Sequence, residues 1–354
     1  MNFIDNIEIK NFKSIRHQKI EGCKRINVFI GYPNVGKSNI LEAIGLLTFV
    51  RLKRPIGLKG LVRFEKLTQL FNNYNIHTAS VIEFNKKYSL NIKYEDEKGL
   101  ELRLIDHEGT DFLFNSGRLG LRVGVEQIHS SLTNGIDDFS GRLKDLQTLE
   151  VKPYKFSEIK SYKEAISALE LDIPFGRNMF EVIINNTELK KEFIDLLEAT
   201  GFQLLFNIAE NDIQVYREIE KGSINTLPVS LIADTLIRLI FFKTAIHSNK
   251  DSILLFEEPE SHMYPPYISK FTSDITCDEN KNQFFITTHS PFVLNDLMAN
   301  VEKDELAIYI VSYEKETGET LVHRMNDNDV QEAYQFGYDF FMNIDQFLPQ
   351  KQHG

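Results

Sequence analysis

The hydrophobic residues of this chain form two kinds of pattern that indicate β-strands. Residues 3–15 alternate apolar and polar side chains, as in a strand that is covered on only one face. Residues 25–30, 252–256 and 283–287 are instead mainly or wholly apolar. Such runs are typical of parallel strands that lie in the centre of a sheet and are buried on both faces. Both ends of the chain therefore predict strands of an α/β domain.

A third set of strands is predicted between these two ends. The runs at residues 79–84, 88–94 and 100–105 are strand-like, and short polar turns separate them. This spacing predicts an antiparallel β-meander and not further βαβ units. We also expect a hairpin over residues 204–219 and a final hairpin over residues 306–324.

The pattern changes between residues 111 and 205. The first half of this stretch is rich in glycine, and its second half has apolar residues at helical spacing. The helical faces are Ile159, Tyr162, Ile166 and Leu169, and then Leu189, Phe193, Leu196 and Leu197. We expect three parts: an N-terminal lobe at 1–110, an inserted and mainly helical subdomain at 111–205, and a C-terminal lobe at 206–354. A buried helix is predicted near residues 231–245, with Ser230 at its N-cap.

One loop between the first buried strand and the helix after it carries a specific chemistry. Residues 31–38 fit G-x-x-x-x-G-K-[ST], the phosphate-binding loop. Its two glycines allow the backbone N–H groups to surround an anion, and Lys37 supplies a positive charge for the β- and γ-phosphates. Ser38 offers a hydroxyl to Mg²⁺. The nucleotide-binding residues are predicted to be Gly31, Tyr32, Pro33, Asn34, Val35, Gly36, Lys37, Ser38 and Asn39.

Composition and charge indicate in which cellular compartment the protein works and which kinds of partner it can bind. The chain carries a formal charge of −11 and only two cysteines, Cys23 and Cys277. We expect a cytoplasmic protein without disulfides or a membrane partner, because no apolar run is long enough to span a bilayer. Residues 1–66 hold 13 Lys/Arg and 5 Asp/Glu. This basic part is either an ordinary solvated surface or a surface that binds nucleic acid.

The motifs favour an ATPase over a GTPase. A GTPase recognises guanine through the motif N-K-x-D. Residues 85–88 and 249–252 begin with N-K, but neither has aspartate at the fourth position. A hydrophobic strand ends instead in Glu257 and Glu258, where paired carboxylates would lie beside the metal of the phosphate loop. Glu257 is predicted to hold Mg²⁺ and Glu258 to act as general base. His289, at the end of the next strand, can hydrogen-bond the γ-phosphate.

Taken together, these motifs resemble a known family. Residues 7–15, 36–44, 256–262 and 288–291 are similar to the ABC-type ATPases of the SMC, RecF and OLD group. The likeness is to the compact AAA-15/AAA-21 type of bacterial antiphage systems such as PARIS and Septu. The resemblance implies a head domain that binds ATP and Mg²⁺ and forms a homodimer, or a higher homo-oligomer, around ATP. It also implies that Ser230 caps the γ-phosphate held by the second subunit.

This chain departs from the family pattern at three places. Glu257 stands where the family usually has aspartate, and the segment 228–235 lacks the usual signature glycine. The place of the metal-sensing glutamine falls on Glu65, with Gln69 as the alternative. The stretch after His289 is too short for the Toprim nuclease of some relatives. We therefore expect a separate effector, either a nuclease or a toxin. The alternatives are a nucleotide-gated scaffold with little turnover and a DNA-maintenance ATPase.

Overall fold

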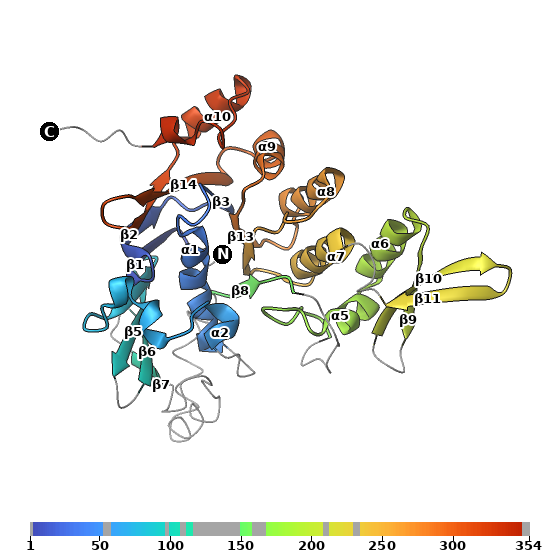
Figure 1. The fold of residues 1–354 in the computed structure, drawn as a ribbon, viewed down its shortest axis with the longest axis horizontal. Coiled ribbons are helices and arrows are strands. Elements are labelled where there is room, and N and C mark those ends of the chain that lie inside the picture. The colour runs from blue at the N-terminus through green and yellow to red at the C-terminus, as the bar shows by residue number, and fades with distance from the viewer. Residues whose placement is uncertain are drawn as a thin grey trace.

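Three β-sheets and the helices between them make up the described part of the protein (Figure 1). The computed structural model describes residues 3–51, 58–95, 99–106, 111–115, 149–157, 168–207, 212–228 and 234–348. Two of the sheets have six strands and the third has three. No helix in these ranges is both long and apolar enough to span a bilayer.

The central sheet joins the two ends of the chain. Its order is β15-β14-β3-β13-β12-β8, and all neighbours are parallel except β14 and β15. The strands are β3 (Ile26–Ile30), β8 (Val151–Tyr154), β12 (Ile253–Glu257), β13 (Gln283–Thr287), β14 (Leu306–Glu314) and β15 (Glu319–Arg324). The three apolar runs of the sequence are thus adjacent strands, as expected for buried parallel strands. The predicted C-terminal hairpin is also confirmed, although β14 pairs with β3 as well.

Helices and a second sheet cover the two faces of the central sheet (Figure 1). Because successive side chains of a strand point to opposite faces, Phe29 and Phe285 enter one core and Val28 and Ile286 the other. The first core includes residues of α1 (Lys37–Gly45) and of the second sheet. The second core includes residues of α7 (Asp234–His247), α8 (Pro265–Thr276) and α9 (Pro291–Asn300). This layering confirms the predicted α/β head.

The second sheet is entirely antiparallel. Its order is β2-β1-β4-β5-β6-β7, so the predicted N-terminal strand and the predicted meander form one sheet. Its strands are β1 (Asn6–Phe12), β2 (Ile15–Glu21), β4 (Ser80–Phe84), β5 (Tyr88–Glu95), β6 (Gly99–Asp106) and β7 (Asp111–Asn115). The short elements between α1 and β4 are η1 (Leu46–Arg51), α2 (Leu58–Leu61), η2 (Leu67–Leu70) and η3 (Asn72–Tyr74).

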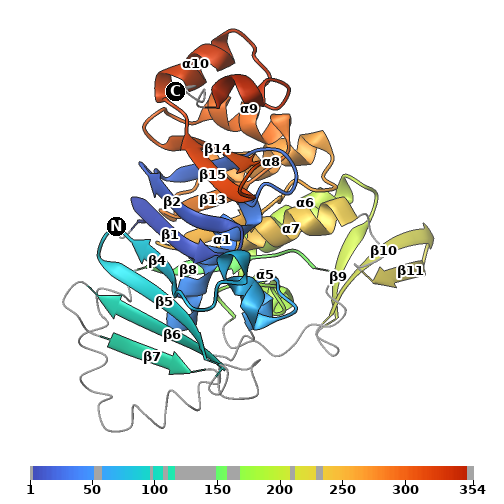
Figure 2. The ribbon, with the colours of Figure 1, turned by 60° about the vertical axis from the view of Figure 1, so that its left-hand side comes forward.

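The middle of the chain forms an arm that projects from the body in both ribbon views (Figures 1 and 2). It contains α5 (Met179–Asn185), α6 (Thr187–Glu198), β9 (Gln203–Asn207), β10 (Asp212–Glu220) and β11 (Ser223–Pro228). α6 buries Leu189, Phe193, Leu196 and Leu197, which confirms that predicted helical face. The β9–β10 hairpin is also confirmed. Most of the helix predicted from Ile159 to Leu169 lies outside the described residues.

Among the elements that the sequence patterns did not anticipate are β8, α10 (Asp327–Gln335) and η6 (Ile344–Phe347). β8 falls within 111–205 but is the edge strand of the central sheet, so this stretch contributes to the head as well as to the arm. Near the C-terminus, α10 and η6 pack their apolar residues on the core beside α9.

Candidate functional site

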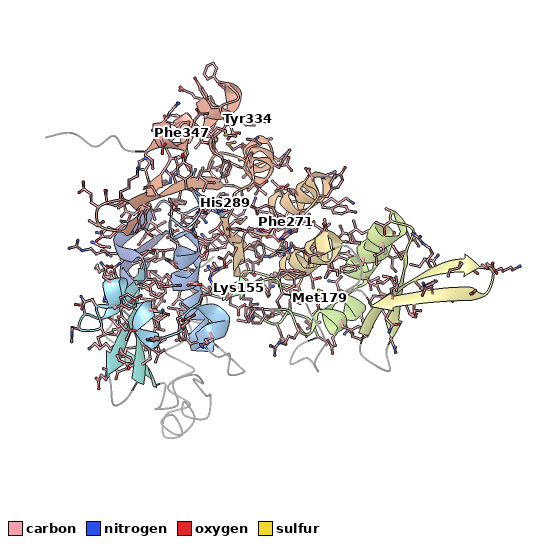
Figure 3. All side chains as sticks on the ribbon, in the orientation of Figure 1. Lys155, Met179, Phe271, His289, Tyr334 and Phe347 are labelled. Atoms are coloured by element: carbon pink, nitrogen blue, oxygen red, sulfur yellow. The ribbon has the colours of Figure 1, made fainter. Side chains whose placement is uncertain are left out.

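Three of the sequence motifs meet at one edge of the central sheet. β3, β13 and β12 are adjacent and parallel, so the segments that follow them leave the sheet at the same edge. The phosphate-loop sequence follows β3, and Glu258 directly follows β12. His289 is the second residue after β13. The Nε2 atom of His289 lies 3.4 Å from Oε1 of Glu258. His289 lies near the centre of the molecule, between the N-terminal elements and helices α8 and α9 (Figure 3).

The loop before α1 has the features of an anion site. α1 begins without a side-chain cap and without an acidic residue in its first turn. Its first N–H groups and its dipole therefore favour a negatively charged ligand. Lys37 is buried, and its ammonium donates to the carbonyl oxygens of Gly31 at 3.0 Å and Tyr32 at 2.9 Å. A triphosphate would take over these hydrogen bonds, so the loop fits a nucleotide.

Both glycines of the loop are required by close packing. A Cβ atom on Gly31 would lie 2.2 Å from the backbone oxygen of Val311, and one on Gly36 would lie 2.1 Å from Oγ1 of Thr320. Gly36 also has a φ of +98°, a region that favours glycine. The loop thus lies directly against β14 and β15, the C-terminal hairpin.

A chain of hydrogen bonds fixes the loop to that hairpin. Asn39 Nδ2 donates to Ser14 Oγ at 2.6 Å, and Thr320 Oγ1 donates to the carbonyl of Val35 at 2.8 Å. Ser14 Oγ and Thr320 Oγ1 are 2.6 Å apart, and Ser14 is the donor because the Thr320 proton is already used. Thr320 was not identified from the sequence, because no motif includes it. Ser14 lies within the N-terminal motif but was given no role there.

Lys37 carries a shifted pKa that follows from its position. Burial lowers the pKa of Lys37 to about 8, although the carboxylates of Glu258 and Glu260 oppose the shift. In the free protein, Lys37 therefore begins to lose its proton as the pH rises through about 8. Phosphates stabilise the ammonium form, so nucleotide binding above this pH must take up a proton.

This proton uptake is measurable by calorimetry. At pH 8.5 we expect ATP binding to take up about three quarters of a proton at Lys37, seen as different binding heats in two buffers of different ionisation enthalpy. The Lys37→Arg variant serves as control because arginine stays charged at this pH. Equal heats for the wild type in both buffers would contradict the prediction.

The acidic tip of β12 is held in an unusual backbone conformation. Glu258 has a φ of +43°, which is rare for a residue with a side chain and is often found at functional sites. Its N–H donates to the carbonyl oxygen of Thr287 at 3.0 Å, which ties the tip to β13. Ser261 Oγ lies 3.4 Å from Glu258 Oε2. The carboxylate of Glu258 therefore faces the site while its backbone is fixed.

Glu260 orients the segment that carries His289. Its Oε1 atom accepts hydrogen bonds from Thr288 Oγ1 at 2.7 Å and from the His289 N–H at 3.0 Å. Burial lowers the pKa of His289, and nearby Lys37 lowers it further against the opposing effect of Glu258. The imidazole of His289 is therefore mainly neutral at pH 7, so one ring nitrogen is a donor and the other an acceptor. The sequence pattern placed Glu260 in the acidic motif but indicated no role for it.

The predicted metal-sensing residues lie in a segment whose contacts were not foreseen. Glu65 is exposed, and the side-chain oxygen of Gln69 accepts from the N–H groups of Glu65 at 2.7 Å and Lys66 at 3.1 Å. The side chain of this segment that contacts Glu257 is Arg63, whose Nη2 lies 2.7 Å from Glu257 Oε1. The metal-sensing role of Glu65 or Gln69 stays a prediction. Ser230 lies outside the described residues.

The residues present are compatible with Mg²⁺. Among the described ranges there is no cluster of three or more His, Cys, Asp or Glu side chains that could hold a metal ion by themselves. Mg²⁺ is commonly bound by one or two protein oxygens together with phosphates and water. Ser38 and Glu257 stay the predicted side-chain ligands.

The lysine and arginine side chains between Lys10 and Arg25 are paired with carboxylates of the same molecule. Ion pairs connect Lys10 and Lys19 with Glu8, Lys13 with Glu42, Arg16 with Glu319, Lys24 with Asp327, and Arg25 with Glu305. Such pairing reduces the positive field available for a phosphate backbone. These contacts favour the interpretation as ordinary surface and fold-stabilising charge.

The fold and the site define an α/β P-loop protein with the strand-end carboxylates and histidine of an ABC-type ATPase. A family model described as "AAA domain, putative AbiEii toxin, Type IV TA system" matches residues 26–295. The chain belongs to this AAA_21 family, which confirms the resemblance drawn from the motifs.

Two curated proteins and one solved structure show low sequence identity to this chain. The chain is similar to the Septu protein PtuA of Bacillus mycoides (strain KBAB4), with 26% identity over 89% of this chain and 41% of that protein. The chain thus spans less than half the length of PtuA. An ATP/GTP phosphatase of Helicobacter pylori (strain ATCC 700392 / 26695) is 22% identical over 81% of this chain and 85% of that protein. An Smc head domain from Pyrococcus furiosus, solved with a domain of ScpA, aligns with a TM-score of 0.49 and 15% identity. The alignment covers 96% of this chain and 100% of that chain.

Proposed function

We propose that this chain is a Mg²⁺-dependent ATPase whose heads dimerise around ATP. The observation that carries the proposal is the meeting of the loop with Lys37, the carboxylate of Glu258 and the imidazole of His289 at one sheet edge. A phosphate loop alone would support binding only. A carboxylate and a neutral imidazole beside it add the groups that phosphoanhydride hydrolysis needs.

Each side chain has a distinct role in this proposal. Lys37 and the N–H groups of the loop bind the β- and γ-phosphates, and Ser38 and Glu257 hold the metal. Mg²⁺, when bound, neutralises charge that develops on the phosphate oxygens. Glu258 accepts the proton of the attacking water, and His289 donates a hydrogen bond to the γ-phosphate.

Two points support the proposed dimerisation: the loop is exposed, and the resemblance to the family implies a dimer around ATP. Tyr32, Pro33 and Asn34 are exposed, so a second subunit can reach the bound nucleotide from that side. We propose that Ser230 of one subunit caps the γ-phosphate in the other. ATP binding would then close the dimer and hydrolysis would open it.

The biological role proposed for this cycle is the control of a separate effector. The similarity to the Septu protein PtuA supports a role in antiphage defence, with a nuclease or toxin as the partner that the dimer restrains or releases. Switching by nucleotide state is a common way to couple such a partner to a signal.

The Lys37→Ala variant tests the biochemical part of the proposal. Loss of the charged hydrogen bonds to phosphate is expected to weaken ATP binding by roughly 10- to 100-fold. ATP hydrolysis and mass photometry with ATP, ADP or GTP would be measured on both proteins. We expect ATP-dependent dimers and turnover in the wild type only. A wild type that stays monomeric with ATP, or a variant with full turnover, would refute the proposal.

A further inference from the structure

Arg63 connects the metal-binding carboxylate with the helix of the phosphate loop. Its Nη2 atom lies 2.7 Å from Glu257 Oε1, while its Nε lies 3.0 Å from Glu42 Oε1. The backbone N–H of Arg63 also donates to Glu42 Oε1, at 3.1 Å. The guanidinium therefore bridges β12 and α1.

The two carboxylates differ in how much they depend on this guanidinium. Glu42 has a side chain only 1% exposed, and it also interacts with Lys13 and, at 3.8 Å, with Lys155. Its charge stays compensated if the Arg63 side chain moves. The one ion pair of Glu257 among the described residues is with Arg63, while Lys155 interacts with it only at longer range.

The position of Arg63 allows such a movement. It lies on the short segment between α2 and η2, and its side chain is 60% exposed. Rotation into solvent would hydrate the guanidinium further, so its main cost is the loss of the ion pairs with Glu42 and Glu257, which is small for a largely exposed side chain. Deprotonation cannot release Glu257, because arginine stays charged in proteins.

We propose that Arg63 occupies Glu257 as an internal cation and thereby keeps metal from binding until nucleotide is present. A guanidinium and Mg²⁺ compete for the same carboxylate oxygen, and the metal gains enough affinity to win only when phosphates provide further oxygen ligands. Arg63 is thus a positioning residue that lowers the metal affinity of Glu257, so that the metal is held firmly only when nucleotide phosphates add their oxygen ligands. This inference rests on the proposed metal role of Glu257.

The test measures Mn²⁺ binding by electron paramagnetic resonance, without nucleotide and without turnover. Removal of the competing cation in Arg63→Gln is expected to raise the Mn²⁺ affinity of the free protein by about two- to fivefold. Arg63→Lys keeps a positive charge, so most of the competition with the metal for Glu257 should remain. Arg217→Gln, on the arm, is the control for an equal change in net charge.

A double variant locates the metal. The gain in Arg63→Gln must disappear in Arg63→Gln/Glu257→Gln if Mn²⁺ binds at Glu257. Because Arg63 competes for Glu257 with or without nucleotide, Arg63→Gln should raise the Mn²⁺ affinity by the same factor when a non-hydrolysable ATP analogue is bound. Circular dichroism would check that each variant is folded, and Arg63→Lys supplies the comparison if Arg63→Gln is not.

The outcomes separate this inference from the proposed function. A gain in Arg63→Gln no larger than in Arg217→Gln, or a gain that persists in the double variant, would overturn the role of Arg63 even if the wild type hydrolyses ATP. An ATP-binding protein without turnover that still shows the gain would support the role of Arg63 and refute the ATPase proposal.

Discussion

Replacement of Glu258 by glutamine is expected to lower the kcat of ATP hydrolysis by about 10²- to 10⁴-fold, the usual effect of removing a general base. Glutamine keeps the size of the side chain, and the backbone bond from residue 258 to Thr287 does not depend on the carboxylate. ATP binding should therefore remain. The dimer should accumulate, because ATP binding would close it and hydrolysis would no longer open it.

The measurement combines steady-state turnover with mass photometry at saturating ATP and Mg²⁺. Glu279→Gln, an exposed carboxylate change in the α8–β13 connection, is the matched control for the lost charge and should behave as the wild type. Turnover in Glu258→Gln within a few-fold of the wild type would show that Glu258 is not the base. That result, with ATP-dependent dimers in both proteins, would favour the nucleotide-gated scaffold.

Much of the head could be predicted from local sequence patterns. The continuous apolar runs around Val28, Leu255 and Phe285 identified three central strands, and the alternating run near Ile9 identified a strand covered on one face. These patterns are reliable because burial on one or both faces is imposed residue by residue. The phosphate loop was identified for a related reason, since glycines are required where the backbone approaches another segment closely.

The contacts between distant segments could not be predicted in the same way. β8 is a short edge strand, and its four residues show no pattern that distinguishes it from a loop. Thr320 contacts Val35 across 285 positions, and Arg63 contacts Glu257 across 194. A threonine in a hairpin and an arginine in a basic stretch look ordinary until the fold brings their partners near. The residues that support the site were therefore missed, while only those within a motif were predicted.

Gly36 offers the sharpest test of this support, because the loop lies directly on Thr320. The Gly36→Ala variant is expected to lose about 4 kcal/mol of unfolding free energy and most of its ATP affinity. Two causes contribute: the φ of +98°, which is strained for alanine, and the overlap of the new Cβ with Thr320 Oγ1 at 2.1 Å. Ser14 Oγ, at 2.7 Å, adds to the overlap.

Three further variants separate these causes. Gly222 has a φ of +86°, but a Cβ atom added there would meet nothing within 4 Å, so Gly222→Ala should show only the backbone strain, about 1–3 kcal/mol. Thr320→Ala alone should cost about 1 kcal/mol for its hydrogen bond to Val35. Added to Gly36→Ala, it removes the closest overlap and should recover part of the lost stability. Thermal unfolding and ATP titration of the four variants, compared with the wild type, would measure how much backbone strain and overlap each contribute. Equal losses in Gly36→Ala and Gly222→Ala would mean that the hairpin does not constrain the loop.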